Sequence, residues 1–223
     1  MRIFAISDIH GCKNTLLALL DKIALSPSDT LYLLGDYINR GPDSKGVIDL
    51  IWALSNQGYT LKCLRGNHEQ MLLNKVAADH KQTGPGLETQ ELLHSFGVAR
   101  ALEIPKEYLK WMGDLPHLAE LPGYILVHAG LNFQVADSLA DTTSMLWIRQ
   151  WHDLINQKWL GERVIVHGHT PQPHSQTIYD LGELDRKPAL CIDCGCALVQ
   201  APYGQLCAFD LGNRTLYFQN YKG

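Results

Sequence analysis

Three strand-like runs near the start of the chain each end in a polar cluster, and this repeated pattern constrains the fold more than any other sequence feature. The runs are residues 2–7, 30–34 and 60–64, and apolar residues recur at helical spacing in the two segments between them. A strand–helix–strand–helix–strand order predicts parallel strands joined by right-handed crossovers. Because ligands collect at the carboxyl ends of such strands, we expect the polar clusters to meet in space.

The rest of the chain predicts a helical middle and a strand-rich second half. Residues 69–115 are mostly helical by pattern, with a polar Gly/Pro break at 82–86 that is typical of a loop. Further strands are expected at 124–127 and 163–166. Shorter strands, which indicate a second sheet built from hairpins, are expected in four later runs: 176–179, 189–192, 206–209 and 215–219.

The sequence has no internal repeat and no evident linker, so we expect a single domain over residues 1–223. Its expected class is α/β (α+β by some schemes), with a central β-sandwich of two mixed sheets flanked by helices.

Composition and charge exclude several classes of protein. The 223 residues carry 19 Lys and Arg against 23 Asp and Glu, a formal net charge of −4. Proteins that grip the nucleic-acid backbone are usually basic, so we expect no nucleic-acid partner. No apolar run approaches the length of about 18 residues that a membrane span needs. The N-terminus lacks the pattern of a signal peptide, and we therefore expect a cytoplasmic protein with no membrane partner.

Six cysteines are present, and in a reducing cytoplasm they are expected to be free thiols. The run Cys191 to Cys196 contains a C-x-x-C spacing, which zinc sites use, but no second pair of ligands stands at a suitable distance along the chain. A buried strand is therefore favoured over a zinc site for this run.

Five strand ends carry residue types that bind metals. They are Asp8 with His10, Asp36, Asn67 with His68, His128, and His169. Carboxylate, imidazole and amide oxygen together suit Mn²⁺, Fe or Zn better than Ca²⁺. Each residue alone is weak support for a site, but the coincidence of all five strand ends is strong.

The motifs around these residues, taken in order, resemble those of the calcineurin-like metallophosphoesterase superfamily. They are S-D-I-H-G from Ser7, G-D-Y-I-N-R-G from Gly35, G-N-H-E from Gly66, H-A-G from His128 and G-H-T from Gly168. Within that superfamily they are most similar to the phosphoprotein phosphatase family. This family includes bacterial and phage serine/threonine phosphatases and symmetrical diadenosine tetraphosphatases.

The resemblance implies two divalent cations, with Mn²⁺ expected and Fe, Zn, Ni and Co as alternatives. It assigns Asp8 and His10 to the first cation and Asp36 to a bridge between the two. The second cation would be held by three residues: Asn67, His128 and His169. The implied reaction is hydrolysis of a phosphoric ester by direct attack of water, without a covalent enzyme intermediate.

The resemblance also implies residues that act on the substrate. Arg40 and Arg149 would bind phosphate oxygens, and Asn67 would also contact the substrate. His68 would act as the general acid, against the alternative of a structural role. The family usually has Asp where this chain has Asn39, so we expect a proton held less firmly on His68 and slower cleavage of poor leaving groups.

The substrate class stays open between two candidates, both phosphorylated. A serine/threonine protein phosphatase, including one of dual specificity, is favoured over a hydrolase of dinucleoside polyphosphates or another small phosphorylated metabolite. The helical segment of about residues 70–115 and the loops at 132–143 and 171–187 would set the specificity. A reading from another class, a weakened sensor of phosphorylated ligands, depends on Asn39 alone.

A few further residues were weighed without a firm role. His167 is interpreted as structural rather than as a ligand. Asp193 lies in a strand-like run, and two interpretations of it stay open: a purely structural position, or support of the metal-binding histidines. The three tryptophans Trp147, Trp151 and Trp159 are expected in the core rather than as stacking platforms.

Overall fold

The first sheet of the computed structural model carries the N-terminal strands. The structure describes residues 1–78 and 87–223. Strands β3 (Thr60–Cys63), β2 (Thr30–Leu33) and β1 (Ile3–Ile6) are parallel neighbours, as the sequence predicts. The sheet is completed by a hairpin of β8 (Gln205–Asp210) and β9 (Thr215–Asn220), with β8 antiparallel to β1. The sheet is therefore mixed.

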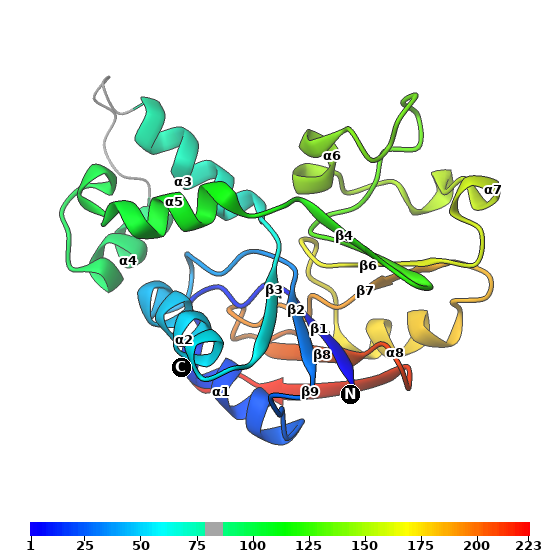
Figure 1. Cartoon of the computed structure of the whole chain (residues 1–223), viewed down its shortest axis with the longest axis horizontal. Coiled ribbons are helices and arrows are strands. Elements are labelled where there is room, and N and C mark those ends of the chain that lie inside the picture. Colours follow the sequence, from blue (N-terminus) through cyan, green and yellow to red (C-terminus); the bar gives the residue numbers. More distant parts are fainter. Residues whose placement is uncertain (79–86) are drawn as a thin grey trace.

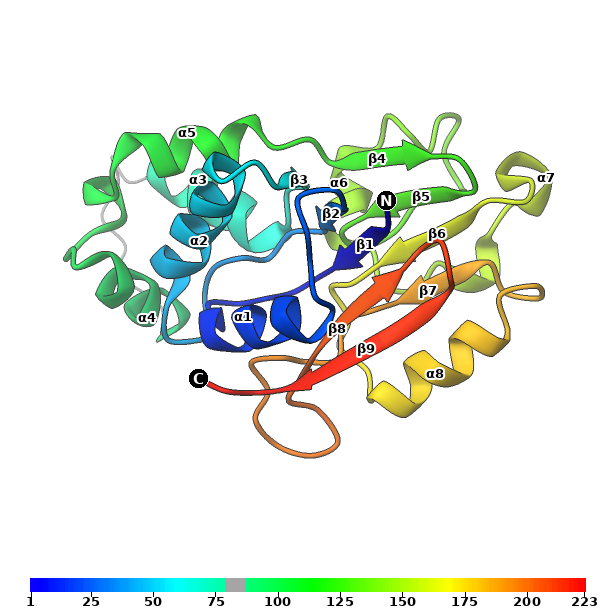
Figure 2. The ribbon, with the colours of Figure 1, turned by 60° about the horizontal axis from the view of Figure 1, so that its bottom comes forward.

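The second sheet has four strands in the order β4–β5–β6–β7. Strand β4 (Leu118–Leu121) is antiparallel to β5 (Tyr124–Val127), whereas β5, β6 (Val164–His167) and β7 (Ala189–Cys191) are parallel. This sheet is mixed as well, and the two sheets lie face to face (Figure 2). The expected sandwich of two mixed sheets with flanking helices is confirmed.

Alternation along the strands distributes the apolar side chains among three cores. In β1, Phe4 and Ile6 pack against the helices, while Ala5 packs in the layer between the sheets. Helices α1 (Lys13–Lys22) and α2 (Ser44–Asn56) cover the outer face of the first sheet (Figure 1). The central strand β1 buries Phe4, Ala5 and Ile6 in succession, whereas β2 alternates and the edge strand β3 has no buried residue. The packing around β1 and β2 holds the polar loops at their ends in fixed positions.

The middle of the chain is helical, as expected. Helix α3 (Asn67–Ala78) begins at the end of the first sheet, and α4 (Leu87–Phe96) and α5 (Lys106–Asp114) project with it to one side (Figure 1). A short 3-10 turn, η1 (Ala101–Glu103), joins α4 to α5. The loop expected at 82–86 lies outside the described residues.

Short helices precede and follow β6. Three of them lie between β5 and β6: α6 (Thr142–Trp147), η2 (His152–Leu154) and α7 (Gln157–Leu160). Among the described residues, none of the helices combines the length and the apolar character needed to cross a membrane.

Two expectations about the second half of the chain are wrong. The run 176–179 is not a strand but part of helix α8 (His174–Gly182), which packs beside β7 with Thr177 buried. The second sheet is also not built from hairpins, because the β8–β9 hairpin pairs with β1 instead. The cause is non-local: β1 offers a free edge about 200 residues upstream, and only tertiary pairing decides which sheet the hairpin joins.

Candidate metal centre

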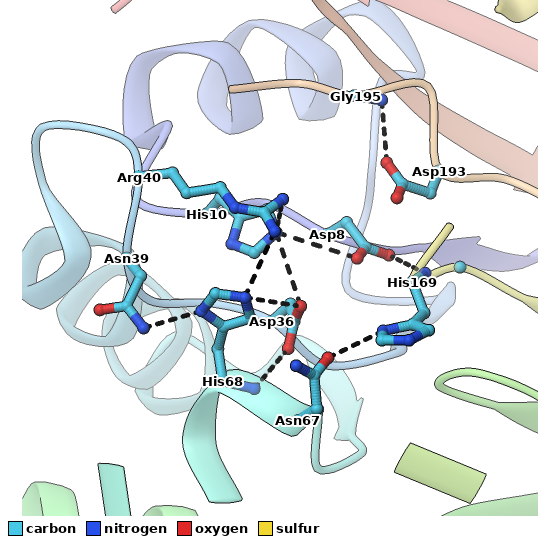
Figure 3. A network of polar contacts seen from close by, with 12 residues as sticks. Asp8, His10, Asp36, Asn39, Arg40, Asn67, His68, His169, Asp193 and Gly195 are labelled. Atoms are coloured by element: carbon cyan, nitrogen blue, oxygen red, sulfur yellow. Dashed lines mark hydrogen bonds and ion pairs between the residues drawn. The ribbon is translucent and has the colours of Figure 1, made fainter. Parts of the chain in front are cut away.

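The loops that follow β1, β2, β3 and β6 bring Asp8, His10, Asp36, Asn67 and His169 into one place (Figure 3), and His128, after β5, lies against Asp36. Asp8, Asp36 and His169 have backbone φ angles of 52°, 56° and 71°, in the left-handed region that residues other than glycine rarely occupy. Such strain costs about 1–3 kcal/mol per residue and is concentrated at functional sites. The sharp turns aim the polar side chains at a common point, and all three residues are buried.

One group of ligand atoms gathers around Oδ2 of Asp36. His10 Nε2 lies 3.5 Å from this oxygen, and His68 Nε2 lies 3.9 Å from the same oxygen. His10 Nε2 is also 4.0 Å from Asp8 Oδ1. The Nδ1 atom of His10 is 3.0 Å from the carbonyl oxygen of Ile38. A carbonyl only accepts hydrogen bonds, so Nδ1 carries the proton and Nε2 presents its lone pair to the centre.

A second group gathers around the other oxygen of the same carboxylate. Asp36 Oδ1 is 3.5 Å from His128 Nε2. The amide oxygen of Asn67 lies 2.8 Å from His128 Nε2 and 2.9 Å from His169 Nδ1. The Nδ1 atom of His128 is 3.0 Å from the carbonyl oxygen of Leu34, which turns Nε2 inward. Asp36 is thus the one residue common to both groups.

The electrostatics of these groups favours cations between them. Burial and the nearby carboxylates of Asp8 and Glu69 raise the pKa of Asp36 well above its usual value. Burial also lowers the pKa of His10 and of His128, which keeps both imidazoles neutral and available as ligands. Crowded buried carboxylates beside neutral imidazoles and an amide oxygen form a donor set that fits Mn²⁺, Fe or Zn. The residues present therefore fit a two-cation site.

Beside the first group, Asn39 and Arg40 both contact His68. Asn39 Nδ2 lies 2.8 Å from His68 Nδ1, and the buried Oδ1 of the same amide has no partner among the described residues. Arg40 places Nη1 3.0 Å from His10 Nε2 and Nη2 3.4 Å from His68 Nε2. Burial, followed by the charge of Arg40, lowers the pKa of His68 to about 3.

The carboxylate of Glu69 has a role that the sequence reasoning missed. It accepts backbone N–H groups from Asp36 at 2.9 Å, Tyr37 at 2.9 Å and Gly66 at 3.0 Å, and it is fully buried. It thereby fixes the loop that carries Asp36. The sequence carries a signal for this role, because Glu69 is the last residue of the intact G-N-H-E motif.

Two predicted contributors lie at the edge of the site. Arg149 is exposed, and its Nη1 donates to Thr170 Oγ1 at 3.3 Å. The pKa of His169 is lowered to about 3, mainly by burial and to a smaller extent by His128 and Arg149. Asp193 is buried and accepts the backbone N–H of Gly195 at 2.8 Å (Figure 3). Burial and the charge of Asp8 raise the pKa of Asp193, which places its carboxyl within electrostatic reach of the ligands.

His167 and the cysteines were the alternative metal ligands in the sequence, and neither faces the metal centre as part of a ligand group. His167 turns away from the ligands: Nδ1 donates to its neighbour's carbonyl at Gly168, and Nε2 lies 3.0 Å from Nε2 of His152. All six cysteines are free, and Cys191, Cys194 and Cys196 are buried. Within the described part of the chain, no potential metal group of three or more residues includes a cysteine.

Of the three tryptophans, Trp151 lies in the core as expected, with 1% of its surface exposed. The expectation is wrong for Trp147 and Trp159, which are 42% and 36% exposed. The Trp147 ring lies 6.4 Å from that of His169, centroid to centroid, at the rim of the site. The short helix α6 ends at Trp147, so its side chain leaves the apolar face that buries Met145 and Leu146.

A family model described as calcineurin-like phosphoesterase matches residues 1–199 of the chain. This match confirms the resemblance inferred from the motifs. Members of that superfamily use a pair of divalent cations, in agreement with the two ligand groups that share Asp36.

Curated relatives match part of the chain. A symmetrical bis(5'-nucleosyl)-tetraphosphatase of Dechloromonas aromatica is 37% identical over 132 residues, which cover 59% of this chain and 44% of the relative. One of Nitrosomonas europaea is 35% identical over 132 residues, covering 59% and 45%. The matched region spans less than half the length of these relatives.

Solved structures match along the whole chain. A protein provisionally named as a diadenosine tetraphosphatase has a TM-score of 0.67 at 25% identity, covering 100% of this chain and 95% of the other. A serine/threonine phosphatase from Saccharomyces cerevisiae has the same TM-score at 17% identity, covering 100% and 80%. The second likeness shows a shared fold only.

Proposed function

The chain belongs to the calcineurin-like phosphoesterase family, and we propose that it hydrolyses phosphoric esters or anhydrides with two divalent cations, with Mn²⁺ as the expected metal. The observation that carries this proposal is the position of Asp36, whose two oxygens face two separate groups of buried ligand atoms. When bound, such a pair of cations neutralises charge on the phosphoryl group and lowers the pKa of water. The proposed ligands are those of the sequence analysis, namely Asp8, His10, Asp36, Asn67, His128 and His169.

The side chains around the metal centre are suited to hold the phosphoryl group. The half-buried guanidinium of Arg40 faces the first group from the side of the Asn39 loop and can present paired N–H groups to phosphate oxygens. Arg149, which contacts Thr170, would add a second contact, and Asn67 is proposed to contact substrate as well.

His68 is the proposed general acid, and Asn39 orients it. In the structure Nδ2 of Asn39 lies against Nδ1, and the guanidinium of Arg40, which only donates, lies 3.4 Å from Nε2, so both ring nitrogens face donors. With the amide rotated by half a turn, Oδ1 accepts from a protonated Nδ1, and the neutral ring presents the lone pair of Nε2 to Arg40 and to the centre. In that orientation Asn39 also accommodates an imidazolium by hydrogen bonding, but it supplies no charge to favour the acid form.

The relatives change the order of the two substrate classes. The sequence reasoning favoured phosphorylated proteins, whereas the relatives at 35–37% identity carry the name of dinucleoside tetraphosphatases. We therefore propose a dinucleoside polyphosphate, or another small phosphorylated metabolite, as the first candidate substrate. A protein phosphatase is the second candidate, supported by the exposure of Trp147 and Arg149 on an open rim where a peptide can lie. Helices α3 to α5, the segment at 132–143 and the segment at 171–187, which folds in part as α8, are proposed to set this specificity.

A parallel turnover assay tests the proposal. Purified protein with Mn²⁺ is given p-nitrophenyl phosphate, a diadenosine polyphosphate and a phosphoserine peptide, with Asp36→Ala as the inactive control. Faster cleavage of the dinucleotide than of the peptide supports the first candidate, and the reverse order supports the second. Binding of Mn²⁺ and phosphate without any turnover would refute an enzyme and support the sensor.

A further inference from the structure

A cavity adjoins the metal centre without containing any of its proposed ligands. It has a volume of about 430 Å³ and lies between α8, the ends of β6 and β7, and the segment after α6. Figure 2 shows α8 alongside β7, so that the helix forms one wall. Cavities of about 300–1,000 Å³ hold small ligands and cofactors. The volume is therefore sufficient for a group of nucleotide size.

The cavity opens next to the position where the phosphate would be cleaved. Thr170 lines it and directly follows the proposed ligand His169. Arg149 also lines it and donates to Thr170 Oγ1 at 3.3 Å. A substrate held at the metals can therefore extend past Arg149 into the cavity.

Among the charged side chains that line the cavity, cations exceed carboxylates by one: Arg149, Arg186 and Lys187 stand against Asp180 and Glu183. Both oxygens of Asp180 accept neutral amide N–H groups, from Gln172 at 3.0 Å and from Gln176 at 2.7 Å, and its charge stays in place. Glu183 is paired with Arg186 at 2.9 Å. Among the described residues, Arg149 and Lys187 form no ion pair.

The cavity wall also has an exposed aromatic ring. Tyr179 of α8 lines the cavity and is 62% exposed. Aromatic rings stack on nucleobases, and phosphates are held by Arg and Lys side chains. A cationic entrance followed by an aromatic wall matches a phosphate chain that ends in a nucleoside.

We propose that this cavity binds the leaving part of the substrate, a nucleoside phosphate, with Arg149 and Lys187 facing its phosphates and Tyr179 facing its base. This inference rests on the proposed function and specifies its substrate class. The leaving nucleotide is then held while its partner phosphate occupies the metal centre. Neither inorganic phosphate nor a phosphoserine side chain has a group that fills the cavity.

The test measures the affinity of ADP by titration calorimetry, with and without Mn²⁺, and inorganic phosphate serves as the reference ligand. Tyr179→Ala is expected to raise the Kd of ADP about tenfold, in line with the loss of one stacking contact. Lys187→Glu is expected to raise it as well and to change its dependence on salt. The matched control is Ile178→Ala, which removes the neighbouring exposed side chain of the same helix (52% exposed) that does not line the cavity. Thermal unfolding checks that each variant is folded.

The outcomes separate this inference from the proposed function. A Kd of ADP that is the same in Tyr179→Ala, Ile178→Ala and the parent protein overturns the cavity proposal, even if the protein hydrolyses p-nitrophenyl phosphate. Absence of ADP binding to the parent protein also overturns it. If ADP binds and the two α8 variants differ while no ester is hydrolysed, the cavity proposal stands and the proposed function fails.

Discussion

Replacement of Asn39 by Asp probes the proposed proton donor at the position where the motif resemblance implies an aspartate. The amide of Asn39 lies 2.8 Å from His68 Nδ1, so a carboxylate of nearly the same shape would meet the ring at hydrogen-bond distance. It would accept from a protonated Nδ1 and add a negative charge. Both effects favour the imidazolium, and the pKa of His68 rises in Asn39→Asp.

The size of the effect follows from that contact. An opposite charge within about 4–6 Å shifts a pKa by about 1–3 units. Burial and Arg40 hold the pKa of His68 at about 3, well below neutral pH. In that regime each unit of increase raises the protonated fraction about tenfold. At pH 7 we therefore expect kcat to rise about 10- to 1,000-fold for a substrate whose alkoxide must be protonated as it leaves.

The assay compares an alkyl phosphate with p-nitrophenyl phosphate, whose leaving group departs without a proton. For Asn39→Asp we expect a large gain in kcat with the alkyl ester and less than about a threefold change with the aryl ester. The alkaline limb of the alkyl profile should move to higher pH, because activity is lost as pH rises through the pKa of the acid. Asn39→Ala, with metal content measured in all proteins, controls for changes at the cations. Equal effects on both esters would refute the pairing of position 39 with the proton donor.

Three further changes test other parts of the account. Asp36→Ala should abolish turnover of every ester while the thermal unfolding curve stays cooperative; retained turnover would exclude the bridging role. Glu69→Gln should lower stability in the presence of EDTA by about 1–3 kcal/mol, because its amide group meets backbone N–H donors, and no loss would show that these bonds do not hold the loop. Asp29→Asn should cost about 2 kcal/mol at pH 7 in urea unfolding, since buried Asp29 accepts from the backbone and guanidinium of Arg2. These bonds lower the pKa of Asp29, so its contribution is present above about pH 4 and lost in acid; a pH-independent difference would contradict this.

The placement of the ligands could be predicted because it depends on local patterns. The strand–helix alternation fixes β1, β2 and β3 as parallel neighbours, and parallel strands end at one edge. Asp8, Asp36 and Asn67 therefore had to lie near one another. The motifs then identified Asn39 and His68 as partners before any contact was known, and the structure places their side chains 2.8 Å apart.

The features that could not be predicted depend on non-local contacts. Residues 176–179 have a strand-like composition, yet they form part of helix α8. Thr177 and Leu181, four residues apart, lie on one face of this helix; Thr177 is buried and Leu181 packs on the core between the sheets. The sheet to which β8 belongs depends on the free edge of β1, which no local pattern reveals. Glu69 leaves no periodic signal, and only its place at the end of the G-N-H-E motif points to it, because its role depends on backbone N–H groups of the loop after β2.

The central claim is that two cations bind on either side of Asp36, and anomalous diffraction from a crystal grown with Mn²⁺ tests it most directly. The account predicts two manganese peaks about 3.5–4 Å apart. One peak should lie among Asp8, His10 and Asp36, and the other among Asp36, Asn67, His128 and His169. A single peak, or a pair of peaks away from Asp36, would contradict it.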